Sequence, residues 1–244
     1  MVVVDSHVHF GGWGYGKGLP KLKTNEMLAE FDKNGVDKAV VFSANSIDFH
    51  SSNDEIQEAV LQAKGRLIPF ARINPYEGEK ALEELRHRMS KQGWKGVKLH
   101  PTLQGFPLES TIAFPVYDEI AKLKVPVVVH TGSEMFNTPA QLAIIAEMYP
   151  DITFIMAHMG ATFLVEQAII VAKRRDNIIL ESTDVKCKKL RSAVEAVGSE
   201  RVVCGSDYPY DIQAHQLAKA EMSGLSSKDK DNVLGDTISK LLSI

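Results

Sequence analysis

Short apolar segments alternate with longer segments of helical periodicity along most of this chain. The apolar segments are rich in β-branched residues and predict eight strands, near Val2–Val4, Ala39–Phe42, Leu67–Ile73, Gly96–His100, Val125–His130, Thr153–His158, Ile178–Glu181 and Val202–Cys204. The intervening segments predict helices over Asn25–Asn34, Asp54–Lys64, Glu79–Gln92, Phe114–Leu123, Pro139–Met148, Phe163–Arg175 and Lys188–Val197, with another after Asp211. Regular alternation of strand and helix predicts a parallel sheet covered by helices.

Eight strand–helix units in 244 residues fit an α/β fold of the (β/α)8 TIM-barrel type. A doubly wound open sheet is the alternative, but it requires a glycine fingerprint after an early strand, and the glycines within 11–18 have a different spacing. No linker, repeat or low-complexity segment divides the chain, so we expect one domain over residues 1–244. The stretch Tyr210–Ile244 exceeds one helix and predicts an extra C-terminal helix packed on the barrel. Thr24 and Asn53 are the expected N-caps of the first two helices.

The composition is that of a soluble globular enzyme, with 44% hydrophobic and 24% charged residues. The net charge is −3 and no basic stripe is present, so we do not expect nucleic acid as a partner. No apolar run approaches the roughly 20 residues of a membrane span, and no basic segment precedes Val2 as in a secretory signal. Cys187 and Cys204 cannot form a disulfide framework, and the cytoplasm is the expected compartment. The sequence does not indicate an oligomeric state, although barrels often self-associate into homo-oligomers.

Five of the eight histidines fall at the C-terminal ends of predicted strands, where barrels of this type carry their chemistry. They are His7, His9, His100, His130 and His158, and the eighth strand ends in Gly-Ser-Asp207-Tyr-Pro. The remaining histidines lie in loop or helix patterns and are expected in solvent; they are His50, His87 and His215. This distribution predicts a cluster of imidazoles at one end of the barrel.

The pair His7 and His9 shares one face of the first strand, and the alternation of side chains places Val3 and Asp5 on the same face. Two imidazoles at this spacing can hold one metal ion, and two histidines in a surface turn are the alternative. Three imidazoles and one carboxylate suit a divalent transition ion such as Zn²⁺ with a position left for water. A further histidine beside such an ion can carry protons.

Four motifs resemble those of the amidohydrolase superfamily, in the same order along the chain. They are His7-Val-His9, Val-His130-Thr-Gly, Ala-His158-Met-Gly and Gly-Ser-Asp207-Tyr-Pro. The similarity is greatest to the amidohydrolase-related branch, which includes aminocarboxymuconate-semialdehyde decarboxylase, benzoate-type decarboxylases and 2-pyrone-4,6-dicarboxylate lactonase. The resemblance implies a (β/α)8 barrel whose metal ligands are His7, His9, His130 and Asp207. It also implies that His158 is the catalytic histidine and that Asp207 acts as a proton acceptor in hydrolytic members.

Lys98 precedes His100 by two residues, so both point to the same face of the fourth strand. In binuclear members of the superfamily, a carboxylated lysine on this strand bridges two metal ions. Lys98 could have that role, which leaves a second ion open. The alternative is an ammonium paired with a carboxylate, for which Asp5 is the expected partner because an inward lysine needs one. TatD-type nucleases also begin with a His-x-His motif, but they carry a glutamate on this strand that this chain lacks.

Three further residues are candidates for substrate binding. His100 could contact the substrate or approach the metal, or it could be a hydrogen-bonded residue of the barrel mouth. Arg72 could bind a substrate carboxylate through a bidentate contact, or it could form a structural ion pair. Trp13 lies in the glycine-rich loop after the first strand and could cover a ligand, or the loop could be an ordinary exposed one. Glu181 and Asp184 are expected to be structural or solvated, and Cys204 is expected to pack against helices.

These observations favour a metal-dependent hydrolase that attacks the carbonyl of an amide, lactone or ester in a small molecule. The alternative is a nonoxidative decarboxylase of a small unsaturated or aromatic carboxylic acid, with Arg72 as the cationic clamp. Both use the same ligands, so the motifs do not separate them. A non-catalytic metal-binding module is a third class, but the complete ligand set and His158 argue against it.

Overall fold

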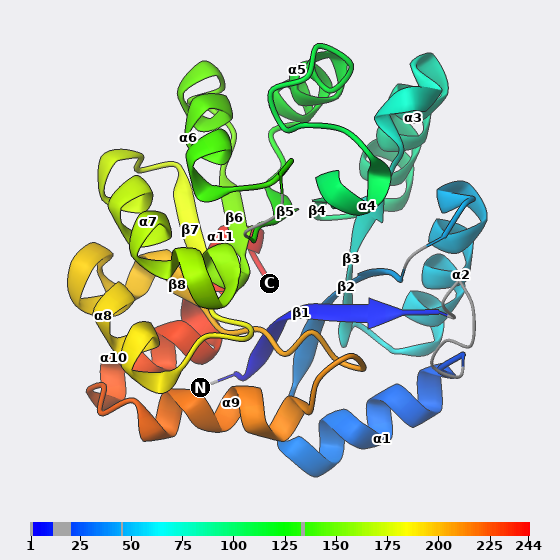
Figure 1. Cartoon of the computed structure of the whole chain (residues 1–244). Coiled ribbons are helices and arrows are strands. Elements are labelled where there is room, and N and C mark those ends of the chain that lie inside the picture. Colours follow the sequence, from blue (N-terminus) through cyan, green and yellow to red (C-terminus); the bar gives the residue numbers. More distant parts are fainter. Residues whose placement is uncertain (1, 12–20, 45, 133–134) are drawn as a thin grey trace.

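Eight parallel strands form the centre of the computed structural model, which describes residues 2–11, 21–44, 46–132 and 135–244. Each strand pairs with the next along the chain, in the order β1 to β8. The strands are β1 (Val4–Phe10), β2 (Lys38–Ser43), β3 (Leu67–Arg72), β4 (Gly96–Leu99), β5 (Val127–His130), β6 (Phe154–Ala157), β7 (Ile178–Glu181) and β8 (Val202–Val203). Figure 1 shows the helices in a ring around these strands. The predicted (β/α)8 barrel is confirmed.

Backbone hydrogen bonds between β1 and the segment after β8 join the two edges of the sheet. The amide of Ser6 donates to the carbonyl of Cys204 at 2.9 Å, and the amide of His9 donates to the carbonyl of Tyr208 at 2.7 Å. Between them, the amide of Asp207 donates to the carbonyl of His7 at 2.8 Å. These contacts place Asp207 directly beside the two histidines of β1.

The helices follow the predicted order with small differences in their bounds. They are α1 (Thr24–Asn34), α2 (Phe49–Gln62), α3 (Glu79–Arg86), α4 (Pro101–Gln104), α5 (Phe114–Leu123), α6 (Pro139–Met148), α7 (Ala161–Arg174), α8 (Cys187–Val197), α9 (Gln213–Met222), α10 (Ser227–Asp231) and α11 (Thr237–Leu242). The expected extra C-terminal helix is present as α11, which lies inside the ring of helices in Figure 1. Within the described residues, no helix has the length and hydropathy that a membrane crossing requires.

Both predicted N-caps are wrong. Helix α1 has Lys23 at its N-cap, so Thr24 is the first helical residue. Helix α2 begins five residues earlier than predicted, because the Asp48 side chain accepts a hydrogen bond from the amide of Ser51 at 3.1 Å. Asn53 is therefore inside the helix, where its buried side chain donates to the carbonyl of Arg72 at 2.9 Å. This contact ties α2 to the carboxyl end of β3.

A second correction concerns the first strand. The pairing of β1 with β2 shifts by one residue between Asp5 and Val8, which marks a bulge. The bulge reverses the alternation of side chains, so Val4 packs in the barrel interior together with Val40 and Val128. The prediction that His7 and His9 share a face is confirmed, because both point to Asp207. Its extension to Val3 and Asp5 is wrong, because Asp5 turns to Gln213 in α9.

Candidate metal centre

Three side chains converge at the carboxyl end of the barrel. Nε2 of His7 and Nε2 of His9 lie 3.2 Å and 2.9 Å from Oδ1 of Asp207. His7 is fully buried, His9 is 6% exposed, and one ligand atom from each of the three residues lies within 4.8 Å of the others. Two imidazole nitrogens and a carboxylate oxygen at one point form a donor set that suits a divalent transition ion.

The opposite ring nitrogens are held by the protein. Nδ1 of His7 lies 3.0 Å from Oε2 of Glu181, and Nδ1 of His9 lies 3.4 Å from the carbonyl of Ser43. These partners turn both Nε2 atoms toward Asp207, as in metal sites where a ligating histidine donates its other N–H to an oxygen. The residues present therefore fit a metal ion.

The electrostatics of this cluster favour unprotonated ligands at two of its three positions. Burial lowers the pKa of His9 to about 3, although its hydrogen bond with Asp207 opposes the change. Burial alone would raise the pKa of Asp207, but the neighbouring His7 and His9 hold it well below its usual range. The pKa of His7 is raised, because Asp207 and Glu181 outweigh burial and the charge of Lys98.

Two positions in the chain after β8 accommodate this cluster. Asp207 has a φ of 60°, the left-handed region that few residues other than glycine adopt, and this turn directs its carboxylate toward β1. A Cβ at Gly205 would lie 2.5 Å from Oε1 of Glu181 and 2.6 Å from Cβ of His7. The Gly-Ser-Asp sequence therefore combines a close approach with a special backbone conformation.

The ammonium of Lys98 lies at the base of the cluster, fully buried. Its Nζ is 3.5 Å from Nε2 of His7 and 4.6 Å from the centre of the Phe42 ring. The expected pair with Asp5 is wrong: the Asp5 carboxylate accepts hydrogen bonds from Ser206 and Gln213 between β1 and α9. Burial lowers the pKa of Lys98 to about 7. Carboxylation of Lys98 as a bridge between two ions stays a prediction.

The other three histidines lie side by side at the ends of β4, β5 and β6. The rings of His100 and His130 stack with centroids 3.7 Å apart, and the ring of His158 lies 4.5 Å from that of His130. The predicted fourth ligand, His130, is not one of the three residues that converge within the described structure. His130 as a ligand and His158 as the catalytic histidine stay predictions. His100 also accepts a long hydrogen bond from the amide of Leu103.

His158 contacts a second acidic residue. Its Nδ1 lies 3.6 Å from Oδ2 of Asp184, and His158, Asp184 and Asp207 form a second group of close ligand atoms. The ring of His158 also lies 4.9 Å from that of His7, so it stands beside the first group. Sequence analysis placed Asp184 in solvent or in a structural role, and its side chain is half exposed.

A cavity of about 260 Å³ opens directly over the cluster. Its lining includes His9, Asp207, His100 and His130, together with Arg72, Leu103 and Tyr210. Arg72 is buried, donates from Nη1 to the carbonyl of Ser43 at 3.1 Å and lies over the Phe49 ring. Two predicted substrate-binding residues, Arg72 and His100, thus line one cavity with the candidate metal ligands. The third, Trp13, lies outside the described residues.

Two residues at this site were not among the candidates from the sequence. Tyr210 was not singled out, and Glu181 was expected to be structural or solvated. Tyr210 follows Asp207 by three residues, and its ring lies 4.8 Å from that of His9. Glu181 is fully buried and follows the interior residue Ile179 by two, so the alternation of β7 already pointed its side chain inward. The three histidines expected in solvent are exposed, and Cys204 is buried in the core between barrel and helices.

Comparison with known proteins gives the family. A family model described as amidohydrolase matches residues 4–244. A curated 2-amino-3-carboxymuconate-6-semialdehyde decarboxylase from Dictyostelium discoideum is 22% identical to this chain over 235 residues. That match covers 79% of this chain and 65% of the relative, so this chain spans less than two thirds of the relative's length.

Solved structures with the same fold include two decarboxylases. The 2,6-dihydroxybenzoate decarboxylase from Rhizobium has a TM-score of 0.81 at 14% identity, over 99% of this chain and 98% of that chain. The 5-carboxyvanillate decarboxylase from Novosphingobium aromaticivorans, in complex with manganese and 4-hydroxy-3-methoxy-5-nitrobenzoic acid, has a TM-score of 0.80 at 14% identity, over 100% of this chain and 96% of that chain. These similarities show a shared fold. Because the family model spans the barrel from β1 to α11, this chain belongs to the amidohydrolase family and is an enzyme of that superfamily.

Proposed function

We propose that this protein is a metal-dependent nonoxidative decarboxylase of a small unsaturated or aromatic carboxylic acid. The observation that carries the proposal is the cavity over the cluster, in which the buried Arg72 accompanies His9 and Asp207. A guanidinium and a metal site that share one small cavity provide two attachment points for an anionic substrate. The names of the relatives support the same choice, since three of those compared are decarboxylases.

The proposed metal ligands are His7, His9, His130 and Asp207. A divalent ion held there would supply Lewis-acid polarisation of a substrate oxygen. Sequence analysis favoured Zn²⁺, whereas manganese accompanies one structural relative, and both are divalent ions. We expect metal analysis to find one equivalent per chain. Two equivalents, falling to one in Lys98→Met, would instead indicate a carboxylated Lys98 that bridges two ions.

The chain's own residues account for binding and proton transfer. In decarboxylation the bond from carbon to the carboxylate breaks, its electron pair stays on that carbon, and a proton is added there as CO₂ leaves. Arg72 would bind an acidic group of the substrate, and the apolar Leu103 and the Tyr210 ring would contact its carbon skeleton. His158 would carry the proton, because its ring lies beside those of His7 and His130, and His130 lines the cavity.

Hydrolysis, the first expectation from the sequence, would use the same centre, with Asp207 as the proton acceptor. The relatives compared support decarboxylation better. The test is an assay of the metal-loaded protein against single-ring aromatic acids, unsaturated dicarboxylic acids, lactones and amides. We expect CO₂ release from at least one acid, with a product one carboxyl group smaller. Turnover of a lactone or amide without CO₂ release from any acid would contradict the proposal.

The Arg72 contact has its own test. Arg72→Gln should raise KM for the acid by about 10-fold or more, because one charge-assisted contact is lost. Metal content should be unchanged, since Arg72 is not a proposed ligand. Arg72→Lys keeps the charge and serves as the matched variant, with a smaller increase in KM.

A further inference from the structure

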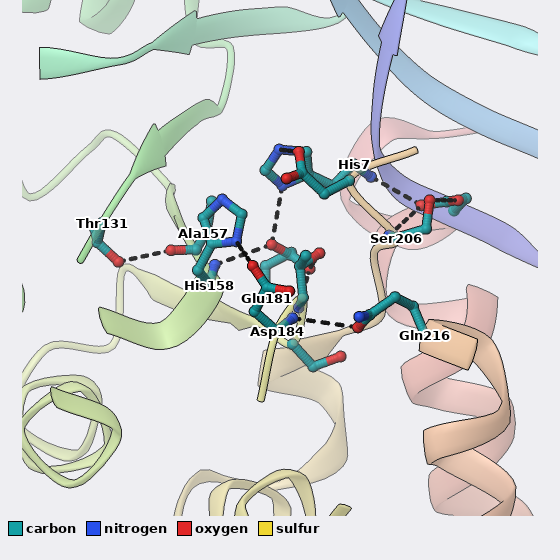
Figure 2. A network of polar contacts seen from close by, with 12 residues as sticks. His7, Thr131, Ala157, His158, Glu181, Asp184, Ser206 and Gln216 are labelled. Atoms are coloured by element: carbon teal, nitrogen blue, oxygen red, sulfur yellow. Dashed lines mark hydrogen bonds and ion pairs between the residues drawn. The ribbon is translucent and has the colours of Figure 1, made fainter. Parts of the chain in front are cut away.

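Glu181 is a buried carboxylate that contacts two separate parts of the active site. Its Oε2 atom lies 3.0 Å from Nδ1 of His7 on β1 and accepts a hydrogen bond at 3.1 Å from the backbone amide of His158 after β6. Figure 2 shows the Glu181 side chain between these two residues. We propose that Glu181 is a positioning residue that fixes the tautomer of His7 and, through the same oxygen, the backbone of His158.

The contact with His7 determines which ring nitrogen carries the proton. A carboxylate accepts hydrogen bonds and cannot donate them, so Nδ1 of His7 must carry the hydrogen. Nε2 lies 3.2 Å from Oδ1 of Asp207, and it is the atom left to bind a metal ion once it has given up its own proton. Glu181 therefore holds the Nδ1–H side of His7 in the orientation that metal ligation requires.

The contact with His158 supports an unfavourable backbone conformation. His158 has a φ of 62° and Met159 has a φ of 44°, in the left-handed region that non-glycine residues rarely adopt. Such a conformation persists only where the surroundings hold it. The hydrogen bond from the His158 amide to Glu181 is one such support. A second is Thr131, whose hydroxyl donates to the carbonyl of Ala157 at 2.7 Å and accepts from the amide of Gly160 at 3.0 Å.

The Glu181 carboxylate is itself locked in place. Its Oε1 atom accepts hydrogen bonds from the amide and the hydroxyl of Thr183, both at 2.6 Å. Gly205 leaves only enough room for this oxygen, since a Cβ there would lie 2.5 Å from it. Four donors thus occupy the two oxygens, and the carboxylate cannot rotate without losing some of them.

His9 has no comparable carboxylate on Nδ1 in the described structure, where its contact is the carbonyl of Ser43 at 3.4 Å. The two ligands of β1 therefore differ: His7 has a short contact with an anion, and His9 has a long contact with a neutral group. Of the two ligands on β1, Glu181 should therefore affect His7 and leave His9 unchanged. The inference rests on the proposed metal site and does not depend on decarboxylation.

The experiment compares Glu181→Ala with wild type in the metal-free protein. Nitrogen-15 NMR of the histidine side chains, in mildly alkaline buffer, reads the tautomer of His7 without any activity assay. We expect wild type to keep a proton on Nδ1 of His7 beside Glu181, and the variant to shift toward the Nε2–H form, whose hydrogen faces Asp207. The amide proton of His158 should exchange faster with solvent in the same variant, and His9 should be unchanged.

Binding of Zn²⁺ and of Mn²⁺, measured by competition with a chelator, is the second readout. Loss of a carboxylate behind a ligating histidine should weaken binding by about 10–100-fold. Glu181→Gln keeps the shape of the side chain but has one acceptor oxygen, so it can accept from only one of the two pairs of donors. Its metal affinity should therefore lie between those of wild type and Glu181→Ala. It carries the test if Glu181→Ala does not fold.

Glu119→Gln is the matched control, because it neutralises another buried carboxylate, which pairs with Arg86 on the outside of the barrel. It should leave the His7 tautomer and metal affinity unchanged. An unaltered His7 tautomer together with an affinity within twofold of wild type in both Glu181 variants would overturn the proposal. Absence of metal binding in wild type would refute the metal site, while the tautomer measurement would still test Glu181.

Discussion

The two ends of the barrel use the same strand faces for opposite purposes. At the amino end, the interior is filled by aliphatic side chains, including Val40, Ile68, Val128, Ile155, Ile179 and Val203, and is covered by Ile238 and Leu242. Two residues further along, the same faces carry His130 on β5 and Glu181 on β7, and Arg72 ends β3 four residues after Ile68. Because side chains on a strand alternate with a period of two residues, the inward face of one strand carries an apolar side chain at the amino end and a polar one at the carboxyl end.

The two ends of the barrel differ in what burial does to the groups that they hold. The amino end is an apolar core whose contribution follows from buried area. At the carboxyl end, burial works against the charged groups, since it lowers the pKa of Arg72 to about 10 and that of His9 to about 3. Substitutions at the amino end should change stability and spare the centre. Those at the carboxyl end should change metal binding or turnover, and should change stability only where they remove a buried charge such as that of Lys98.

The largest expected effect is the loss of turnover in His158→Asn. This change removes a positioned proton carrier, which typically contributes about 10²–10⁴-fold to rate. Metal content and melting temperature should stay close to wild type, because the four proposed ligands remain. The measurement pairs bound metal with turnover on the substrate found in the assay.

His130→Asn is the matched variant, and it should lower metal affinity together with turnover because His130 is a proposed ligand. Equal loss of metal in both variants would make His158 a ligand and overturn the assignment. Full activity in His158→Asn would show that the proposed proton transfer does not apply to this chain.

The next effect concerns stability and has a defined pH dependence. The pKa of Lys98 falls from 10.5 to about 7 in the folded state because the ammonium is buried. Between these values the unfolded chain binds a proton that the folded chain does not, so the contribution of Lys98 to stability rises with pH. Lys98→Met should therefore stabilise the metal-free protein below pH 7, on the order of 5 kcal/mol.

That stabilisation should shrink as the pH rises from 7 toward 10.5, and urea denaturation across this range measures it. Lys122→Met is the control, because the Lys122 side chain is 71% exposed and its removal should give a small and flat difference. If the stabilisation from Lys98→Met does not vary with pH, Lys98 is not a buried ammonium. Carboxylation of Lys98 would give that result.

The sequence predicted the barrel and the end at which the polar residues gather, because both follow from periodicity. The alternation of side chains along β4 also placed Lys98 and His100 on the inward face, whereas Glu181, which is buried on β7, was expected to be structural or solvated. The expected alternation failed at β1, where the bulge after Asp5 reverses it and sends that carboxylate to α9. It also could not give the positive φ of His158 and Asp207, which arise from contacts between segments far apart in the chain.

A change at the amino end should produce the opposite outcome on the same strand. Ile155→Ala removes a fully buried side chain from the interior of β6, three residues before His158. The cavity should lower the free energy of unfolding by about 2–5 kcal/mol, as measured by urea denaturation. Metal affinity and KM should stay within about twofold of wild type. A selective loss of metal affinity at unchanged stability would contradict the separation of the two ends.

The smallest expected effect tests whether α11 is part of the barrel core. Ile238 is fully buried and packs with the interior residues at the amino end, whereas Ile170 on α7 is 51% exposed. Ile238→Val should lower the free energy of unfolding by about 1 kcal/mol, and the melting temperature by about 2–4 °C for a chain of this size. Ile170→Val deletes the same methylene group at a half-exposed position and should change stability by less than about 0.5 kcal/mol. Equal effects of the two substitutions would mean that α11 does not seal the amino end, and the apolar core would then have to be confined to the eight strands and their surrounding helices.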